Sequence, residues 1–271
     1  MSPTFLGLFL AFILGAVGAE ALTFPATVEV DLVFPRNDTY APAALIPVVF
    51  AIQNAQLAAS LDPKFQFTVT SASDSSNEIT TAILDLTNAT FSRSDPYYAL
   101  GYIHSLNGIE GQWVLAWSLS TGNCSGSSDD TVNIGHLNQN TNVFFTTKNG
   151  TQPPDLVAAS ADNSTCAATD DSYTFNVTGT LDVADTIKYD GRSSCAVLSP
   201  TLPTANPCAA AVNVAAAASI SAAITSTACA WQNPNVTCPS SSSSAAGRVM
   251  MFPGIWSVCL LWIGLNFHFW L

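Results

Sequence analysis

Thr27-Val28-Glu29-Val30-Asp31-Leu32-Val33-Phe34 is the stretch that decides the fold predicted for this chain. Apolar side chains stand at every second position, and Glu29 and Asp31 lie between them. Successive side chains of a strand point to opposite faces of its sheet. The pattern therefore predicts a half-buried β-strand with Glu29 and Asp31 on a solvated face.

Similar short segments follow at regular spacing, and Gly, Asn, Pro and Ser separate them. The nearly apolar segment 44–52 suits a strand near the centre of a sheet. Further strands are expected at 65–69, 82–86, 97–104, 112–120, 143–147, 173–177, 180–189 and 196–198. Asn107-Gly108 has the sequence of a tight hairpin turn. The fold class predicted is all-β, an antiparallel two-sheet β-sandwich, Ig-like or related.

The composition changes at Pro200, and residues 201–207 are rich in proline. Asn206-Pro207 reads as an N-cap followed by proline at the first helical position. Residues 208–228 are mostly alanine, with larger apolar side chains on one stripe. They predict one amphipathic C-terminal α-helix.

Both ends of the chain resemble processing signals. An apolar run over residues 5–17 precedes small residues, which predicts a signal peptide at 1–21. The domains expected are a β-sandwich ectodomain at 22–200 and a disulfide-linked helical extension at 201–238. A Ser-rich stalk at 239–247 follows, with a GPI attachment site at Ser243 or Ser244, and the tail at 248–271 is expected to be removed. A single membrane-spanning helix at 249–271 is the alternative, but no Lys or Arg follows it, contrary to the positive-inside pattern.

Six cysteines precede the tail, and Cys259 lies within it. An even count in an exported domain favours disulfides, at Cys124, Cys166, Cys195, Cys208, Cys229 and Cys238. A continuous helix would hold Cys208 and Cys229 about 30 Å apart and exclude that pair. We favour Cys124 with Cys166, Cys195 with Cys208, and Cys229 with Cys238, although sequence alone leaves the connectivity open.

Seven Asn-x-Ser/Thr sequons lie between the two terminal signals. An occupied sequon faces solvent in an exported protein. The expected glycosylation sites are Asn37, Asn88, Asn123, Asn149, Asn163, Asn176 and Asn235.

The net charge of the chain limits the classes of partner that it can bind. The formal net charge is −12, and charged residues make up only 10% of the chain. Such an acidic surface repels nucleic acid and anionic lipid, so we expect contact with a membrane only through the lipid anchor.

No catalytic motif is present, so we assign no catalytic residue, cofactor or metal, and we lean towards a non-enzymatic protein. Glu29 and Asp31 lie two apart on one strand face and could serve as a pair of catalytic carboxylates, but a solvated face is the preferred interpretation. His104 and His136 have no partner that the sequence identifies. The pairs at 129–130 and 170–171 lack the spacing of an EF-hand.

Aromatic residues are the best candidates for ligand contacts. Trp113 and Trp117 share a strand face with leucines, which favours core packing over a sugar-binding platform. Tyr98, Tyr102 and the isolated Trp231 are better candidates for stacking on a ligand.

The segment VDLVFPRNDTYAP at 30–42, followed by IPVVFAIQN at 46–54, resembles a family of secreted, often lipid-anchored fungal proteins of unknown function. The alanine-rich segment between Asn206-Pro207-Cys208 and Cys238-Pro239 is similar to the C-terminal part of the same family. The resemblance implies a fungal source and a cell-surface setting, and it transfers no activity.

Two functions follow as hypotheses. The first is a glycosylated, GPI-anchored cell-surface or cell-wall protein with a structural or interaction role. The alternative is a carbohydrate-binding or carbohydrate-active β-sandwich module acting at the cell wall. The partners expected are cell-wall polysaccharide or other surface proteins, and the location is extracellular.

Overall fold

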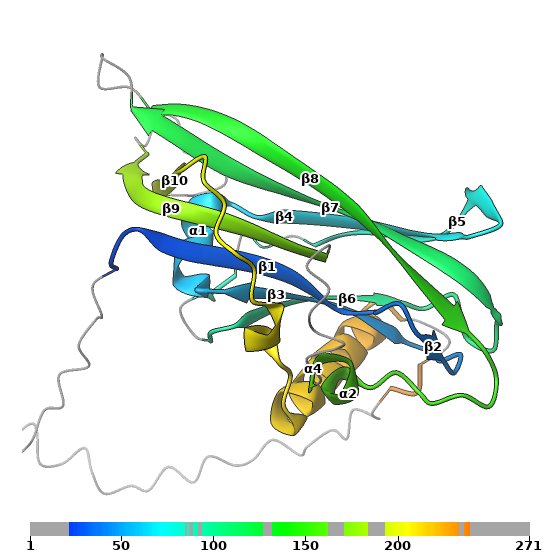
Figure 1. Cartoon of the computed structure of the whole chain (residues 1–271). Coiled ribbons are helices and arrows are strands. Elements are labelled where there is room, and N and C mark those ends of the chain that lie inside the picture. The colour runs from blue at the N-terminus through cyan, green and yellow to red at the C-terminus, as the bar shows by residue number, and fades with distance from the viewer. Residues whose placement is uncertain are drawn as a thin grey trace, which may run out of the picture. The chain divides into compact units, whose positions relative to one another are not determined.

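The computed structural model describes residues 22–84, 86, 89–91, 94–126, 132–161, 171–183, 193–232 and 236–238. The described residues up to Val236 form one compact unit. Within it, the described strands build two five-stranded sheets, as the sequence predicted (Figure 1).

Sheet A has the strand order β10-β9-β1-β3-β6, and every neighbouring pair in it is antiparallel. Its strands are β1 (Ala26–Phe34), β3 (Ile46–Gln53), β6 (Tyr97–Ile103), β9 (Ser172–Asp182) and β10 (Ser194–Leu198). The strand predicted from the opening stretch is thus the centre of its sheet.

Sheet B has the order β2-β8-β7-β4-β5, in which the short β2 pairs with β8 in parallel. Its strands are β2 (Thr39–Tyr40), β4 (Lys64–Ser71), β5 (Asp74–Leu84), β7 (Gly111–Gly126) and β8 (Val132–Thr147). The two sixteen-residue strands β7 and β8 form a long hairpin in regular register.

The main hydrophobic core lies between the two sheets. Phe50 of sheet A packs on Phe65 and Trp117 of sheet B, with ring centroids 4.7 and 4.9 Å apart. Trp113, Leu115, Trp117 and Leu119 are all buried, which confirms the prediction of core packing for this strand face.

The Asn107–Gly108 turn does not close a hairpin, contrary to the prediction. Gly108 has a φ of 71°, the positive value that the turn sequence indicated. However, β6 belongs to sheet A and β7 to sheet B, so the turn leads the chain from one sheet to the other. Its sequence fixes the local backbone, whereas the partner of each strand depends on long-range packing.

Helix α2 (Leu156–Ala161) packs near β1 of sheet A, and helix α4 (Val214–Ala230) packs on β6 of the same sheet. A shorter helix, α1 (Ala58–Leu61), follows a 3-10 turn at Ala55–Leu57. Figure 1 shows α2 and α4 on the same side of the sandwich.

The C-terminal helix begins later than predicted. Pro207–Ala210 forms only a 3-10 turn, and Ala211 is extended with a φ of −58° and a ψ of 133°. Helix α4 starts after Asn213, whose side chain accepts a hydrogen bond from the Ala216 backbone N–H at 2.9 Å. Asn213 is therefore the true N-cap, and the predicted 30 Å separation of Cys208 and Cys229 along one helix does not apply.

Two of the three favoured disulfides are wrong. Cys124 of β7 bonds Cys195 of β10, with their Cα atoms 5.9 Å apart. This bond links sheet B to sheet A, across 71 residues of sequence, so neither cysteine is left for Cys166 or Cys208. Cys208, Cys229 and Cys238 are also disulfide-bonded. Cys166 lies outside the described residues, and the Cys229–Cys238 pair stays a prediction.

Candidate ligand-binding site

A groove opens where the edges of the two sheets meet the end of α4. It has a volume of about 670 Å³ and lies between β5 of sheet B and β6 of sheet A. We call it the aromatic groove. Its lining residues are Thr80, Thr81, Ala82, Ile83, Leu84, Leu86, Tyr97, Tyr98, Ala99, Leu100, Gly101, Tyr102, His104, Thr227 and Trp231.

The aromatic groove contains all three aromatic residues that the sequence singled out as ligand contacts. Tyr98 and Tyr102 come from β6, where even-numbered positions share a face. Trp231 is the C-cap residue of α4 and is 79% exposed. Trp231, which is far from the two tyrosines in sequence, is thus brought to the same surface feature.

Helix packing fixes the position of Trp231. Ile220, Ile224 and Ala228 are the buried face of α4, which lies on β6. The Trp231 N–H then donates to the Thr227 carbonyl at 3.1 Å and ends the helix at the groove. The alanine-rich sequence therefore places an exposed indole rather than only covering a sheet.

The two tyrosines differ in their surroundings. Burial raises the pKa of the half-buried Tyr98, whose hydroxyl donates to the Ala210 and Ala211 carbonyls at 3.5 and 3.4 Å. The Tyr102 ring meets His104 edge-on, with centroids 6.1 Å apart. Tyr98 therefore helps to anchor the covering chain, and the ring pair of Tyr102 and His104 belongs to the groove wall.

Gly101 makes room at the floor of the groove. A Cβ at this position would lie 2.6 Å from Cε1 of the buried Phe67 and 3.3 Å from Cδ2 of Leu84. Sequence reasoning missed Gly101 and Ile83, and it left His104 without a role. For His104, its spacing of two from Tyr102 on a predicted strand was the available signal.

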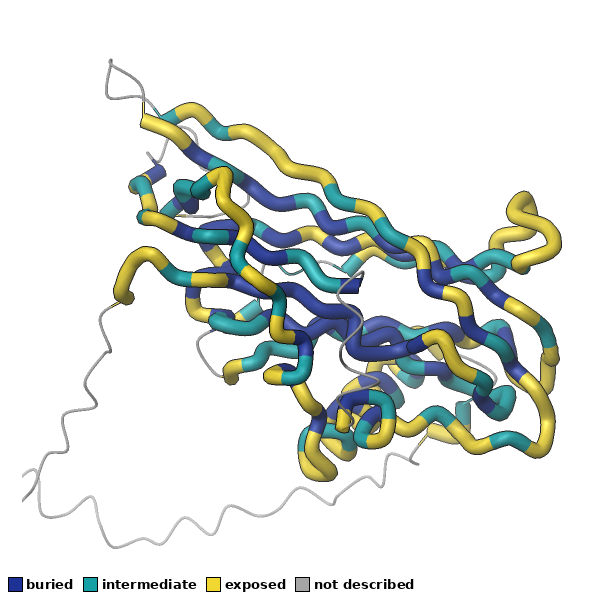
Figure 2. The backbone as a smooth tube through the Cα atoms, in the orientation of Figure 1, coloured by how far each residue is buried: buried dark blue, intermediate teal, exposed yellow. Residues whose placement is uncertain are grey.

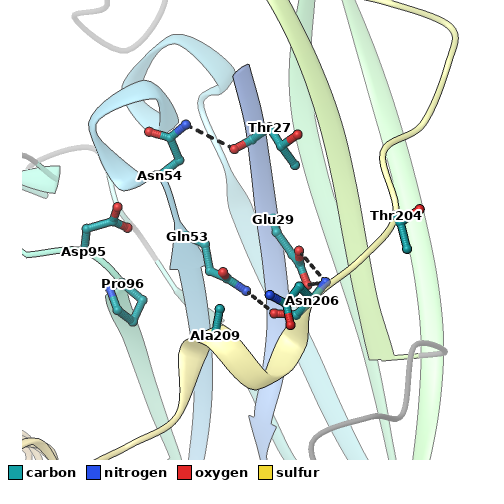
Figure 3. A pocket seen from close by; sticks show the side chains of 9 residues that line it. All are labelled: Thr27, Glu29, Gln53, Asn54, Asp95, Pro96, Thr204, Asn206 and Ala209. Atoms are coloured by element: carbon teal, nitrogen blue, oxygen red, sulfur yellow. Dashed lines mark hydrogen bonds between the residues drawn. The ribbon is translucent and has the colours of Figure 1, made fainter. Parts of the chain in front are cut away.

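The second candidate lies on the outer face of sheet A, and Figure 3 shows it from close by. It is a pocket of about 460 Å³, lined among others by Glu29, Gln53, Asp95 and Asn206. We call it the acid pocket. Glu29 is only 4% exposed and the adjacent Asp31 only 1%, so the predicted solvated face is wrong.

The reason is a covering segment, residues 199–213, which we call the strap. It bonds in turn to four neighbouring strands of sheet A: Ser199 N–H to Asn176 O on β9, Asn206 N–H to Glu29 on β1, Gln53 on β3 to Asn206 O, and Tyr98 on β6 to Ala210 O. The second face of β1 is therefore covered by chain that lies more than 160 residues later.

Glu29 holds the middle of the strap. Both its carboxylate oxygens accept from the Asn206 backbone N–H, at 2.7 and 2.8 Å (Figure 3). Burial raises the pKa of Glu29 to about 7, the bond from Asn206 opposes this shift, and the negative charge of Asp31 adds to it. The carboxyl group therefore changes its charge near neutral pH.

Asp31 is satisfied by neighbours on both sides. Its Oδ2 accepts from Gln53 Nε2 at 2.8 Å, and its Oδ1 accepts from the Ser172 hydroxyl at 2.7 Å. Gln53 also donates to the Asn206 carbonyl at 3.1 Å. The acid pair, the amide and the strap thus form one hydrogen-bonded network.

A buried cation stands at the end of the same strand. Arg36 Nη1 lies 3.6 Å from Asp171 Oδ2, and burial lowers the pKa of Arg36 while the two acids Asp171 and Asp31 oppose that shift. The Tyr40 hydroxyl donates to the Arg36 carbonyl at 3.2 Å, and burial raises the pKa of Tyr40 to about 12. Arg36 partly offsets the negative charge on this face.

The geometry of the acid pocket suits a latch better than catalysis. Glu29 is nearly inaccessible, and the Asn206 N–H occupies both of its oxygens. Asp95, which lines the same pocket, accepts from the Ala55 N–H at 3.2 Å. Glu29 thus holds the strap on the sheet and Asp95 holds the turn at Ala55, whereas the aromatic groove presents open aromatic surface.

The other predicted site residues are spread over the molecule. Asn37 and Asn149 are exposed, whereas Asn123 and Asn176 are half-buried. The Asn123 side chain accepts from the Leu198 N–H at 3.3 Å. The sequons at Asn88, Asn163 and Asn235, and the attachment candidates Ser243 and Ser244, lie outside the described residues.

Within the described ranges, no group of three or more His, Cys, Asp or Glu side chains is placed to hold a metal ion. His136 is exposed on β8, away from the groove residues. None of the helices in these ranges combines the length and the apolar character that a membrane span requires.

Comparison with known protein families gives a match over most of the chain. A family model described as "Domain of unknown function (DUF7136)" covers residues 23–238, which include both sheets, the strap and α4. No curated protein and no solved structure matches the chain.

Proposed function

We propose a function from the surface of this chain itself, since it belongs to the DUF7136 family, a domain of unknown function that supplies no activity. The protein is a glycosylated, GPI-anchored fungal cell-surface or cell-wall protein, and its ectodomain binds neutral cell-wall polysaccharide in the aromatic groove. The role is one of attachment and not of catalysis.

The observation that carries this proposal is the convergence of Tyr98, Tyr102 and Trp231 on one groove. Aromatic faces stack on the apolar faces of sugar rings, and hydroxyl and imidazole groups at the rim bond to sugar hydroxyls. Thr80, Thr81 and His104 supply such groups. Trp231 is 79% exposed at the end of a helix that packs on β6, so its ring face is open to a ligand.

Binding is tested on a glycan array of neutral β-glucans and chitin fragments, followed by calorimetry with the best ligand. Changing Trp231 or Tyr102 to alanine should weaken binding by at least about tenfold, which corresponds to about 1.4 kcal/mol. Phe24→Ala is the matched control, because Phe24 is also an exposed aromatic but precedes β1 and lies outside the groove. Binding that survives both groove changes would refute the proposal.

The proposed location rests on the sequence of the two ends. Small residues, a spacer and an apolar tail follow the family-matched region in the order that GPI attachment requires. Phosphatidylinositol-specific phospholipase C should release the protein from membranes. If it stays bound while a known GPI-anchored protein is released from the same membranes, the anchor is wrong.

A further inference from the structure

The outer face of sheet B carries no described helix. Helices α2 and α4 pack near β1 and β6 of sheet A, and Figure 1 shows the broad face of β7 and β8 on the opposite side. Much of β8 is exposed in Figure 2. A wide sheet face is thus left open within the described part of the chain.

Uncharged hydrogen-bonding side chains occupy the centre of this face. Across the sheet, Ser118 of β7 stands between Gln66 of β4 and Asn140 of β8. In the next row, Ala116 stands between Thr68 and Asn142. We call these six residues the amide face.

The amide face is hollowed at its centre. The small side chain of Ala116 leaves a depression of about 220 Å³ that all six residues line. Gln66, Asn140 and Asn142 are exposed, and each amide offers both a donor and an acceptor. A neutral ligand with many hydroxyl groups matches this chemistry.

Charge argues against a charged partner. The chain carries a net charge of −12, yet the amide face has none, and its margin holds one base, Lys64, and one acid, Glu78. A polycation or polyanion would gain little attraction here.

The glycosylation pattern also leaves this face open. None of the seven sequons falls on β4, β5 or β8. The one on β7, Asn123, directs its side chain to the Leu198 N–H of sheet A. None of the seven sequons is therefore a residue of the amide face.

The amide face continues into the aromatic groove around the edge strand β5. Thr81 pairs with Thr68, and Ile83 pairs with Gln66, so both extend the two rows of the face. The same two residues line the groove, and Ile83 is 71% exposed. From β5 to β8 each row spans three strand spacings, about 14 Å, which is long enough to contact more than one sugar ring.

We propose that the groove and the amide face form one track for an extended neutral polysaccharide, which enters at the aromatic groove and crosses β5, β4, β7 and β8. This rests on the proposed function and deepens it, because it makes the ligand a long chain and not a short glycan end.

The test measures affinity against ligand length with neutral β-glucan oligosaccharides of two and of six units, using the protein expressed from its full chain in a eukaryotic secretory host. We expect the longer oligosaccharide to bind at least about tenfold more tightly. The N140A/N142A double variant should lose most of this gain while it keeps the affinity for the shorter ligand. Ala116→Lys, which fills the hollow, should do the same.

Asn133→Ala is the matched control, because Asn133 lies on the other face of β8 by strand alternation. A length gain that persists in both face variants overturns the track, as does the absence of a gain in the unchanged protein. A dimer in sedimentation that the face variants dissociate also overturns it, since a second copy would then occupy the face. Loss of all binding in Trp231→Ala, by contrast, tests the groove itself.

Discussion

Glu29 makes the domain less stable as the pH rises towards neutrality. Its pKa is raised from 4.5 to about 7 in the folded protein, so the folded state binds a proton that the unfolded state has released. The free energy of unfolding therefore falls as pH rises from about 4.5 to about 7, by at most about 1.4 kcal/mol per pH unit. Thermal melts at pH 5 and pH 8 should show the higher melting temperature at pH 5.

Glu29→Gln separates this effect from other titrations. Its amide oxygen can still accept from the Asn206 N–H, so we expect the variant to melt at a temperature that changes less between pH 5 and pH 8. If the melting temperatures of Glu29→Gln and of the unchanged protein depend on pH in the same way, the titration of Glu29 does not affect stability between pH 5 and pH 8.

Gly101 is the residue of the groove whose replacement has the clearest structural cost. A Cβ placed 2.6 Å from the Phe67 ring must displace a fully buried side chain of the core. Gly101→Ala should lower the free energy of unfolding by about 1–3 kcal/mol in chemical denaturation. The matched change Gly179→Ala meets nothing within 4 Å and should cost much less.

The sequence predicted the burial of a residue correctly where the pattern on one face of its strand was enough to show it. The alternation around Trp113 and Trp117 identified core positions correctly. It failed for Glu29 and Asp31, because alternation separates the two faces of a strand but does not reveal what covers the second one. The covering residue, Asn206, is 177 residues away from Glu29.

At the scale of single elements, the N-cap residue Asn213 sets the start of helix α4, which ends at Trp231. Asn213→Ala removes the side-chain cap on Ala216 N and should lower the free energy of unfolding by about 1 kcal/mol. Asn213→Gly should cost only a few tenths of that, since glycine is a tolerated N-cap. Equal losses in the two variants, measured by urea titration, would contradict the assigned cap.

Whole elements were predicted better than their ends. The polar run at 132–142 lacks the apolar alternation that signals a strand, yet it extends β8 because it pairs with β7 along sixteen residues. The Asn206-Pro207 pattern predicts a helix start at Pro207, whereas the helix begins after Asn213, which is its N-cap. Cap sequences compete, and packing of the strap on sheet A decides between them.

At the scale of the molecule, the Cys124–Cys195 bond ties the two sheets together. It closes a loop of about 70 residues, which corresponds to about 4 kcal/mol of stabilisation in the chain-entropy model. The C124S/C195S double variant should melt about 10 °C lower than the unchanged protein under non-reducing conditions. A shift of only one or two degrees would show that the sheets hold together without the bond.

The sequence could not show which strands and segments of the two sheets contact each other in space. Strand positions and the two-sheet fold followed from periodicity, because each strand carries its own pattern. The partner of Cys124, the covering of Glu29 and the groove between β5 and β6 all depend on which edges meet in space. Tyr98, Tyr102 and Trp231, which the sequence singled out, do line one groove, and their contact with a ligand stays a prediction.

Protection of Trp231 by an oligosaccharide tests the central claim most directly. In the described ranges Trp231 is exposed while Trp113 and Trp117 are buried, so acrylamide quenching of a chain ending at Cys238 reports mainly on Trp231. We predict that a neutral β-glucan hexasaccharide reduces quenching in a saturable way and has no effect in Trp231→Phe. Saturable binding of the sugar that leaves Trp231 fully open to acrylamide would contradict the account.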